Sequence, residues 1–94
     1  MTTIRRIEKE AVSNLQFVDF EVLESKEAKQ KRKENLERAM VLGNNDKVKC
    51  RIVFETIGGP FEIETTIWHT TDNFIDIKGG VPIPVQAIRE IILL

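Results

Sequence analysis

The chain has 94 residues, which suffices for one domain with a single hydrophobic core and excludes two. Its composition, 41% hydrophobic and 31% charged, is typical of an ordinary globular protein and excludes a disordered chain. The formal net charge of −1 argues against tight non-specific binding of nucleic acid, because domains that hold phosphates usually carry a basic excess.

Residues 1–24 are predicted to form an N-terminal arm that contains a short helix, an extra strand, or both. Apolar residues at helical spacing favour a helix from about residue 4 to residue 14: Ile4, Ile7, Ala11 and Leu15. The next segment, LQFVDFEVL, alternates apolar and acidic side chains. We therefore expect an extended segment that keeps Val18, Phe20 and Val22 out of water.

Residues 25–43 are predicted to form a helix. Ser25 is a suitable N-cap residue, and Gly43 is a suitable glycine just beyond the C-terminal end. Leu36 and Met40 can pack on a core, but the first half of the helix has no large apolar residue. We expect that half to project into solvent or to lie against something outside the core.

Residues 44–94 read as short strands with glycine turns between them, and we predict a small five-stranded β-barrel. Val48, Cys50, Ile52 and Phe54 alternate with polar residues in the first strand, and Ile63 and Ile67 continue the apolar face in the second. A turn at Gly58-Gly59 would pair Phe54 with Ile63 and Cys50 with Ile67. Pro82 and Pro84 predict a strand that pairs on one side only or lies beside a bulge. A helical turn at 86–88 precedes the last strand.

This order of elements, a helix followed by five short strands with a helical turn before the last, resembles the SH3-like and Sm-like small barrels. The fold class is therefore expected to be mainly β with an N-terminal helix (α+β). The segments LGN at 42–44, KVKCRIVFET at 47–56, ETTIW at 64–68 and KGGVPIPVQAIREI at 78–91 resemble a small bacterial family of unknown function. A weaker likeness is to the Rho-binding antiterminator proteins. Neither resemblance implies an activity or a binding residue.

No catalytic, metal-binding or cofactor-binding motif occurs in the sequence, so we expect a protein that is not an enzyme and needs no cofactor. Cys50 is expected to be a buried, inert thiol, although a pair with the only histidine, His69, is geometrically conceivable. The N-terminal residues lack the apolar core of a signal peptide, and no apolar run could span a bilayer. We expect a cytoplasmic protein that does not contact a membrane.

Trp68 is the best single candidate for a partner-binding residue. Alternation places it on the outer face, beside Lys49 and diagonal to Arg51, where it could stack on a base or anchor a protein. Alternatively it covers a strand edge or packs under the arm. Glu55, Glu62 and Glu64 share this face and would repel a phosphate backbone. Glu55 and Glu62 are expected to lie opposite each other.

The segment 26–38 is the second candidate, with six basic residues against three acidic ones. Lys26, Lys29 and Lys33 fall on one stripe of the helix, which could hold phosphates or an acidic partner. A solvated helix would show the same pattern.

The function that the sequence favours is a non-enzymatic binding or regulatory module that acts through a protein partner or through self-association. RNA binding is the alternative, and the acidic balance disfavours it. A homodimer through strand edges or the projecting helix is also expected. Alternation in the terminal run, Ile91 to Leu94, leaves two large side chains that need cover from the arm, with Phe17 and Phe20, or from a second chain.

Overall fold

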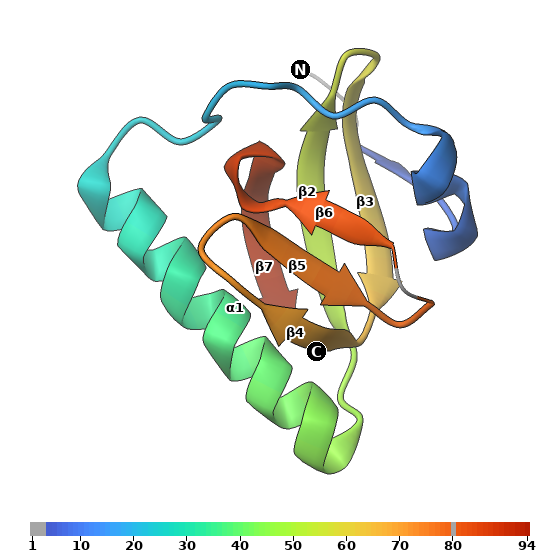
Figure 1. Cartoon of the computed structure of the whole chain (residues 1–94), viewed down its shortest axis with the longest axis vertical. Coiled ribbons are helices and arrows are strands. Elements are labelled where there is room, and N and C mark those ends of the chain that lie inside the picture. The colour runs from blue at the N-terminus through green and yellow to red at the C-terminus, as the bar shows by residue number, and fades with distance from the viewer. Residues whose placement is uncertain (1–3, 80) are drawn as a thin grey trace.

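The computed structural model describes residues 4–79 and 81–94 (Figure 1). It has the mixed α+β composition that the sequence predicts, with most elements being strands. The elements are, in chain order, β1 (Arg5–Arg6), the 3₁₀ helix η1 (Lys9–Asn14), α1 (Lys26–Asp46), β2 (Cys50–Thr56), β3 (Gly59–Thr65), β4 (Ile67–Thr70), β5 (Phe74–Ile77), β6 (Pro82–Pro84), the 3₁₀ helix η2 (Val85–Ala87) and β7 (Ile88–Leu93).

The strands form two sheets that enclose one main core. The first sheet has the order β1-β3-β2-β7, and the second has the order β4-β5-β6. β3 and β4 are interrupted only at Thr66, so the chain passes from one sheet to the other there. Among the described strands β6 and β7 are not paired, and the sheets do not close. The closed five-stranded barrel expected from the sequence is therefore not confirmed.

The β2–β3 hairpin has a register that differs by two residues from the predicted one. Phe54 pairs with Phe61 and Cys50 pairs with Thr65, because the turn consists of Ile57 and Gly58 rather than Gly58-Gly59. Gly59 follows the turn with φ +111°, a conformation that favours glycine. A shift of two residues keeps every side chain on its face, so the prediction of the buried face survives the error in pairing.

The sequence predicts a core of Val48, Ile52, Phe54, Ile63, Ile67, Ile77, Ile83, Ile88 and Ile91, with Leu36 and Met40 from the helix, and this core is largely confirmed. The buried members of the predicted set are Leu36, Ile52, Phe54, Ile63, Ile67, Ile77, Ile83, Ile88 and Ile91. Val48 and Met40 are only half-buried. Val53, which alternation places on the outer face, is also buried, since its strand lies in the interior of the four-stranded sheet.

The N-terminal arm forms neither a helix from residue 4 nor a regular extra strand from residue 15. β1 adds two residues in parallel to β3, and η1 buries Val12 in the main core. The segment 15–24 then crosses the molecule to the start of α1 (Figure 1). Val18 and Val22 pack with Ala87 in a small second cluster. Phe20, expected to be covered, is 61% exposed.

The helix α1 begins as predicted and ends three residues beyond the predicted end. The Ser25 hydroxyl accepts a hydrogen bond from the Ala28 N–H at 3.0 Å, and Lys47 (φ 55°) is the left-handed C-terminal cap. Gly43 is therefore an interior helical residue rather than a terminating glycine. A Cβ atom there would lie 2.6 Å from the Ile67 carbonyl oxygen and 2.7 Å from Thr66 Cγ2. The glycine allows α1 to approach the β3–β4 bend closely.

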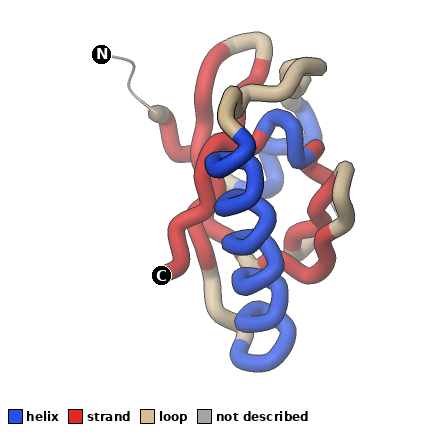
Figure 2. The backbone as a smooth tube through the Cα atoms, turned by 90° about the vertical axis from the view of Figure 1, so that its left-hand side faces the viewer, coloured by secondary structure: helices blue, strands red, loops and turns tan. Residues whose placement is uncertain are grey.

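The edges of both sheets are protected against pairing with another chain. β1 has two residues, and β6 carries Pro82 and Pro84 and pairs with β5 only, as predicted. The edge strands β4 and β7 both contact α1, which lies in front of the strands in Figure 2. Asn44 of α1 also donates a hydrogen bond to the Trp68 carbonyl oxygen of β4 at 3.2 Å. These features are the usual protections of edge strands, so nothing in them favours an edge-to-edge dimer.

No helix in the described part of the chain is both long enough and apolar enough to cross a membrane.

Gly43→Ala tests the close approach of α1 to the bend. In an open helix this change stabilises a protein by about 0.5–1 kcal/mol. Here the new methyl group meets a strand carbonyl, and we expect a loss of about 1–3 kcal/mol in the free energy of unfolding, the usual cost of overpacking. Urea denaturation followed by circular dichroism measures it. Asn45→Ala, at an exposed position of the same helix, is the control and should change stability by less than about 0.5 kcal/mol.

Candidate binding groove beside the helix

Arg32 ties the first half of α1 to the rest of the molecule. Its side chain is only 7% exposed. Nη1 donates hydrogen bonds to Glu21 Oε2 at 2.7 Å and to the Ile88 carbonyl oxygen at 3.0 Å, and Nη2 donates to Glu21 Oε1 at 2.6 Å. A bidentate ion pair of this kind is the strongest geometry for arginine and a carboxylate. One guanidinium therefore connects the arm, the helix and the start of β7.

The same contact controls the ionisation of Glu21. The hydrogen bonds from Arg32 are the main cause of a lowered pKa for this carboxyl group, and they outweigh the opposing effect of partial burial. Glu21 is thus held as a carboxylate. This carboxylate matches the positive charge of Arg32.

A groove of about 690 Å³ runs beside the first half of α1. We call it the α1 groove. The helix supplies the basic side chains of Lys26, Lys29 and Lys33 together with Arg32. The end of β4 supplies Thr70, and the turn between β4 and β5 supplies Thr71 and Asp72. Gln30, Glu37 and the buried Leu36 and Val85 complete the lining. The three lysines that the sequence placed on one helical stripe thus share one cavity.

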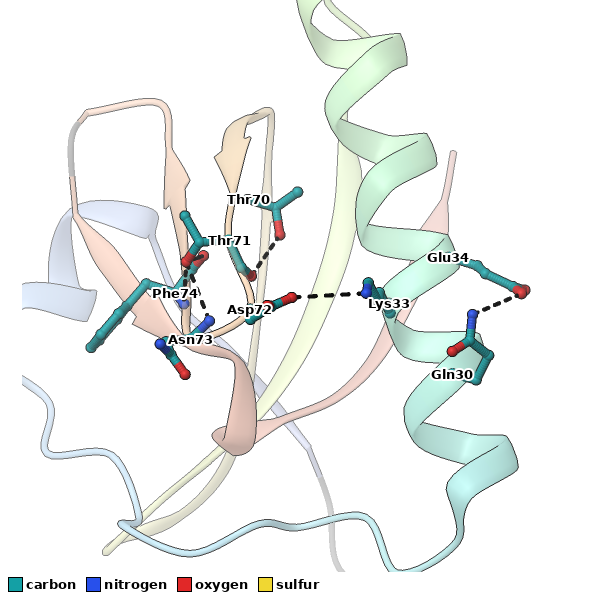
Figure 3. A network of polar contacts seen from close by, with 8 residues as sticks. All are labelled: Gln30, Lys33, Glu34, Thr70, Thr71, Asp72, Asn73 and Phe74. Atoms are coloured by element: carbon teal, nitrogen blue, oxygen red, sulfur yellow. Dashed lines mark hydrogen bonds and ion pairs between the residues drawn. The ribbon is translucent and has the colours of Figure 1, made fainter.

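The turn that faces the helix is held by Thr71. Its hydroxyl accepts hydrogen bonds from the Asn73 N–H at 3.2 Å and the Phe74 N–H at 3.0 Å, and it donates one to the Phe74 carbonyl oxygen at 3.1 Å (Figure 3). Asp72 lies at the tip of this turn and reaches across to the helix, where Oδ1 is 3.8 Å from Lys33 Nζ. The backbone that carries Asp72 is therefore fixed opposite the lysines.

The other predicted site residues lie elsewhere. Trp68 is 50% exposed on β4, as alternation predicts, but β4 pairs with β5 in the second sheet. Arg51 is in the first sheet opposite Glu64 and is 3.7 Å from Glu62. Lys49 lines a small separate pocket with Glu64 and Lys78. Trp68 and Arg51 therefore belong to different sheets, because the chain changes sheets at Thr66.

Within the described residues, the three glutamates on the outer face of the β2–β3 hairpin each have an arginine partner. Glu55 pairs with Arg89 of β7, while Arg6 of β1 contacts both Glu62 and Glu64. Glu55 lies opposite Pro60, so the predicted repulsive pair with Glu62 does not occur. The two-residue shift in register removes it.

Cys50 is buried as predicted, with 1% of its surface exposed. Loss of hydration raises the pKa of its thiol to about 11, so the thiolate that would act as a nucleophile is disfavoured at neutral pH. Cys50 pairs with Thr65 in the first sheet, whereas His69 lies opposite Asp76 in the second. The conceivable Cys50–His69 pair is therefore not formed.

Comparisons of the chain with protein-family models, curated proteins and solved structures found no match. The resemblance to a small bacterial family and the weaker likeness to Rho-binding antiterminator proteins remain predictions.

Sequence reasoning missed Arg32 and Asp72. A signal for Arg32 was present: it precedes Leu36 by one helical turn, so it occupies a core-facing position of α1. Residues buried at such positions are rarely charged unless they are paired. The signal for Asp72 was only its place in a turn, which does not indicate which helix the turn faces.

Glu21→Gln tests the Arg32 contact through its pH dependence. The folded-state pKa of Glu21 is lowered, so its carboxylate stabilises the protein above the unfolded pKa of about 4.5, and this stabilisation is lost as pH falls through the folded value. We expect Glu21→Gln to be less stable than the parent protein at pH 7. The difference should shrink as pH falls below about 4.5.

Urea denaturation at pH 7 and at a pH below about 4.5 measures the difference in the free energy of unfolding between the variant and the parent protein. Glu24→Gln, a neighbouring exposed carboxylate, is the control and should show little difference at either pH. An equal loss of stability in Glu21→Gln at both pH values would show that the charge of Glu21 in its ion pair with Arg32 does not stabilise the fold.

Proposed function

We propose that this protein is a non-enzymatic binding module that holds an acidic segment of a protein partner in the α1 groove. The observation that carries the proposal is the convergence of Lys26, Lys29 and Lys33 on one wall of a cavity large enough for several residues of a peptide. Ammonium groups in this arrangement attract carboxylates.

The ion pairs of the groove leave two lysines to receive a ligand. Arg32 is matched by Glu21, and Lys33 has a weak contact with Asp72. Among the described residues, neither Lys26 nor Lys29 has a carboxylate within 4.0 Å. Both are exposed, so a partner would not have to remove a buried structural charge. Such contacts favour fast association and specificity over very tight binding.

A protein segment is favoured over RNA by the charges outside the three lysines. The groove also contains Glu37 and Asp72, and the whole chain has a net charge of −1. RNA binding draws most of its affinity from phosphate contacts, for which this balance is poor. A catalytic role has little support, since the groups with shifted pKa values in the described chain, Glu21 and Cys50, do not line the groove.

The proposed relation to SH3-like and Sm-like small barrels is supported by the order of elements. A helix precedes the bent β2–β3–β4 ribbon, and η2 separates the last two strands. This relation is an analogy of fold and carries no ligand with it.

Charge reversal at Lys29 tests the proposed site. Lys29→Glu should weaken binding of a fluorescently labelled oligoglutamate peptide by about three- to ten-fold, the effect expected when one exposed attraction becomes a repulsion. Fluorescence anisotropy at low and at physiological salt measures the affinity.

The matched control is Lys31→Glu, two residues away on the same helix. Lys31 lines a separate hollow between α1 and β7 and not the α1 groove. The control changes the net charge equally, so an equal loss in both variants would reject the groove as the site. Tighter binding of oligouridine than of oligoglutamate by the parent protein would favour the RNA alternative.

Self-association is the second candidate, and one observation favours it. Ile92 is 37% exposed and Leu94 is 55% exposed, as alternation in the terminal run predicts. The arm does not cover them, because its Phe17 packs on Phe54 with ring centroids 5.4 Å apart. A homodimer would therefore use these side chains rather than the protected strand edges.

Light scattering coupled to gel filtration tests this candidate. We expect a dimer mass for the parent protein and a shift towards the monomer for the Ile92→Ser, Leu94→Ser double variant. A monomeric parent protein at high concentration would contradict it. Ile57→Ser, at a 71% exposed position in the β2–β3 turn, is the control and should leave the mass unchanged.

A further inference from the structure

The two walls of the α1 groove carry opposite charges. The helical wall is basic, with Lys26, Lys29 and Lys33, whereas the wall formed by the β4–β5 turn carries the carboxylate of Asp72 and two uncharged threonines. Asp72 is 88% exposed, and its contact with Lys33 is long. It is therefore not needed to neutralise a buried charge.

We propose that Asp72 is a specificity-determining residue of the α1 groove, an inference that rests on the proposed function of that groove. It admits a polypeptide segment that carries carboxylates towards the helix and a lysine or arginine towards the turn. It disfavours uniformly negative chains such as single-stranded RNA.

Nucleic acids and peptides differ in the sign and spacing of the charges along their chains. A nucleic acid carries a phosphate at every nucleotide, so a strand in the groove brings negative charge near both walls. Repulsion by Asp72 then offsets part of the attraction by the lysines. A peptide can place charges of either sign along its length. A basic residue in it could pair with Asp72 while its glutamates reach Lys26 and Lys29.

The turn is built so that this charge stays in place. The Thr71 hydroxyl fixes the backbone through its hydrogen bonds with Asn73 and Phe74 (Figure 3). These bonds fix the backbone position from which the Asp72 carboxylate extends towards the groove. Glu37 lies on the helical side of the same groove and adds a second negative group.

Asp72→Asn tests the inference, with Asp46→Asn as the matched control. Asp46 is exposed at the far end of α1, so its substitution changes the net charge equally without altering the groove. Two labelled probes are titrated by fluorescence anisotropy at several salt concentrations. One is oligouridine, and the other is a short peptide in which a lysine follows several glutamates.

We expect Asp72→Asn to tighten oligouridine binding by about two- to five-fold, the effect of removing one exposed repulsion. The same substitution should leave peptide binding unchanged or weaker. Asp46→Asn should not change the ratio of the two affinities. A circular dichroism melt confirms that the variants are folded, which is expected because both side chains are exposed.

The inference is overturned if Asp72→Asn strengthens oligouridine binding no more than Asp46→Asn does, or if it strengthens both probes equally. Failure of the proposed function is a separate result: the parent protein would not bind the peptide, whatever Asp72→Asn does to oligouridine.

Discussion

The buried guanidinium of Arg32 is the interaction on which the arrangement of the helix depends. The first half of α1 has no large apolar side chain that could attach it to the core. Arg32 replaces that attachment with a polar one, since a cation buried to this extent must be matched by acceptors. Glu21 and the Ile88 carbonyl oxygen supply them from the arm and from β7. Because the attachment is a long side chain rather than direct packing, there is space for a groove beside the helix.

A second constraint is the close contact at the other end of α1. Gly43 lets the helix backbone approach the bend between β3 and β4, where any larger residue would meet the Ile67 carbonyl oxygen. The helix is thus held closely at its C-terminal half and more loosely at its N-terminal half. The same helix protects the edges of β4 and β7. The side of α1 that lines the α1 groove carries Lys26, Lys29 and Lys33, which is consistent with the proposed binding of a charged segment.

The distribution of charge explains how a chain with a net charge of −1 can present a basic surface. On the outer face of the first sheet, arginines from β1, β2 and β7 lie against the glutamates. Around α1 the balance is different, because Glu21 is used by Arg32 and only Asp72 faces the lysines across the groove. The net charge of −1 therefore coexists with a basic helical wall in the α1 groove.

The sequence by itself determined the inner face of the β2–β3 hairpin and where α1 begins. Alternation identified the inner face of β2 and β3 and the exposed position of Trp68, and Ser25 marked the start of the helix, because these features depend on neighbours along the chain. Alternation has a period of two residues, however, so it could not distinguish the true hairpin register from one shifted by two.

Only the tertiary structure decided which distant segments meet. It placed Arg32 on Glu21 and Gly43 on the β3–β4 bend, and it put Asp72 opposite the lysines of α1. It also left Phe20 exposed and put Trp68 and Arg51 in different sheets. These outcomes depend on the path of the arm, the bend at Thr66 and the packing angle of the helix. All three are set by contacts between residues far apart in the chain, for which a local pattern contains no information.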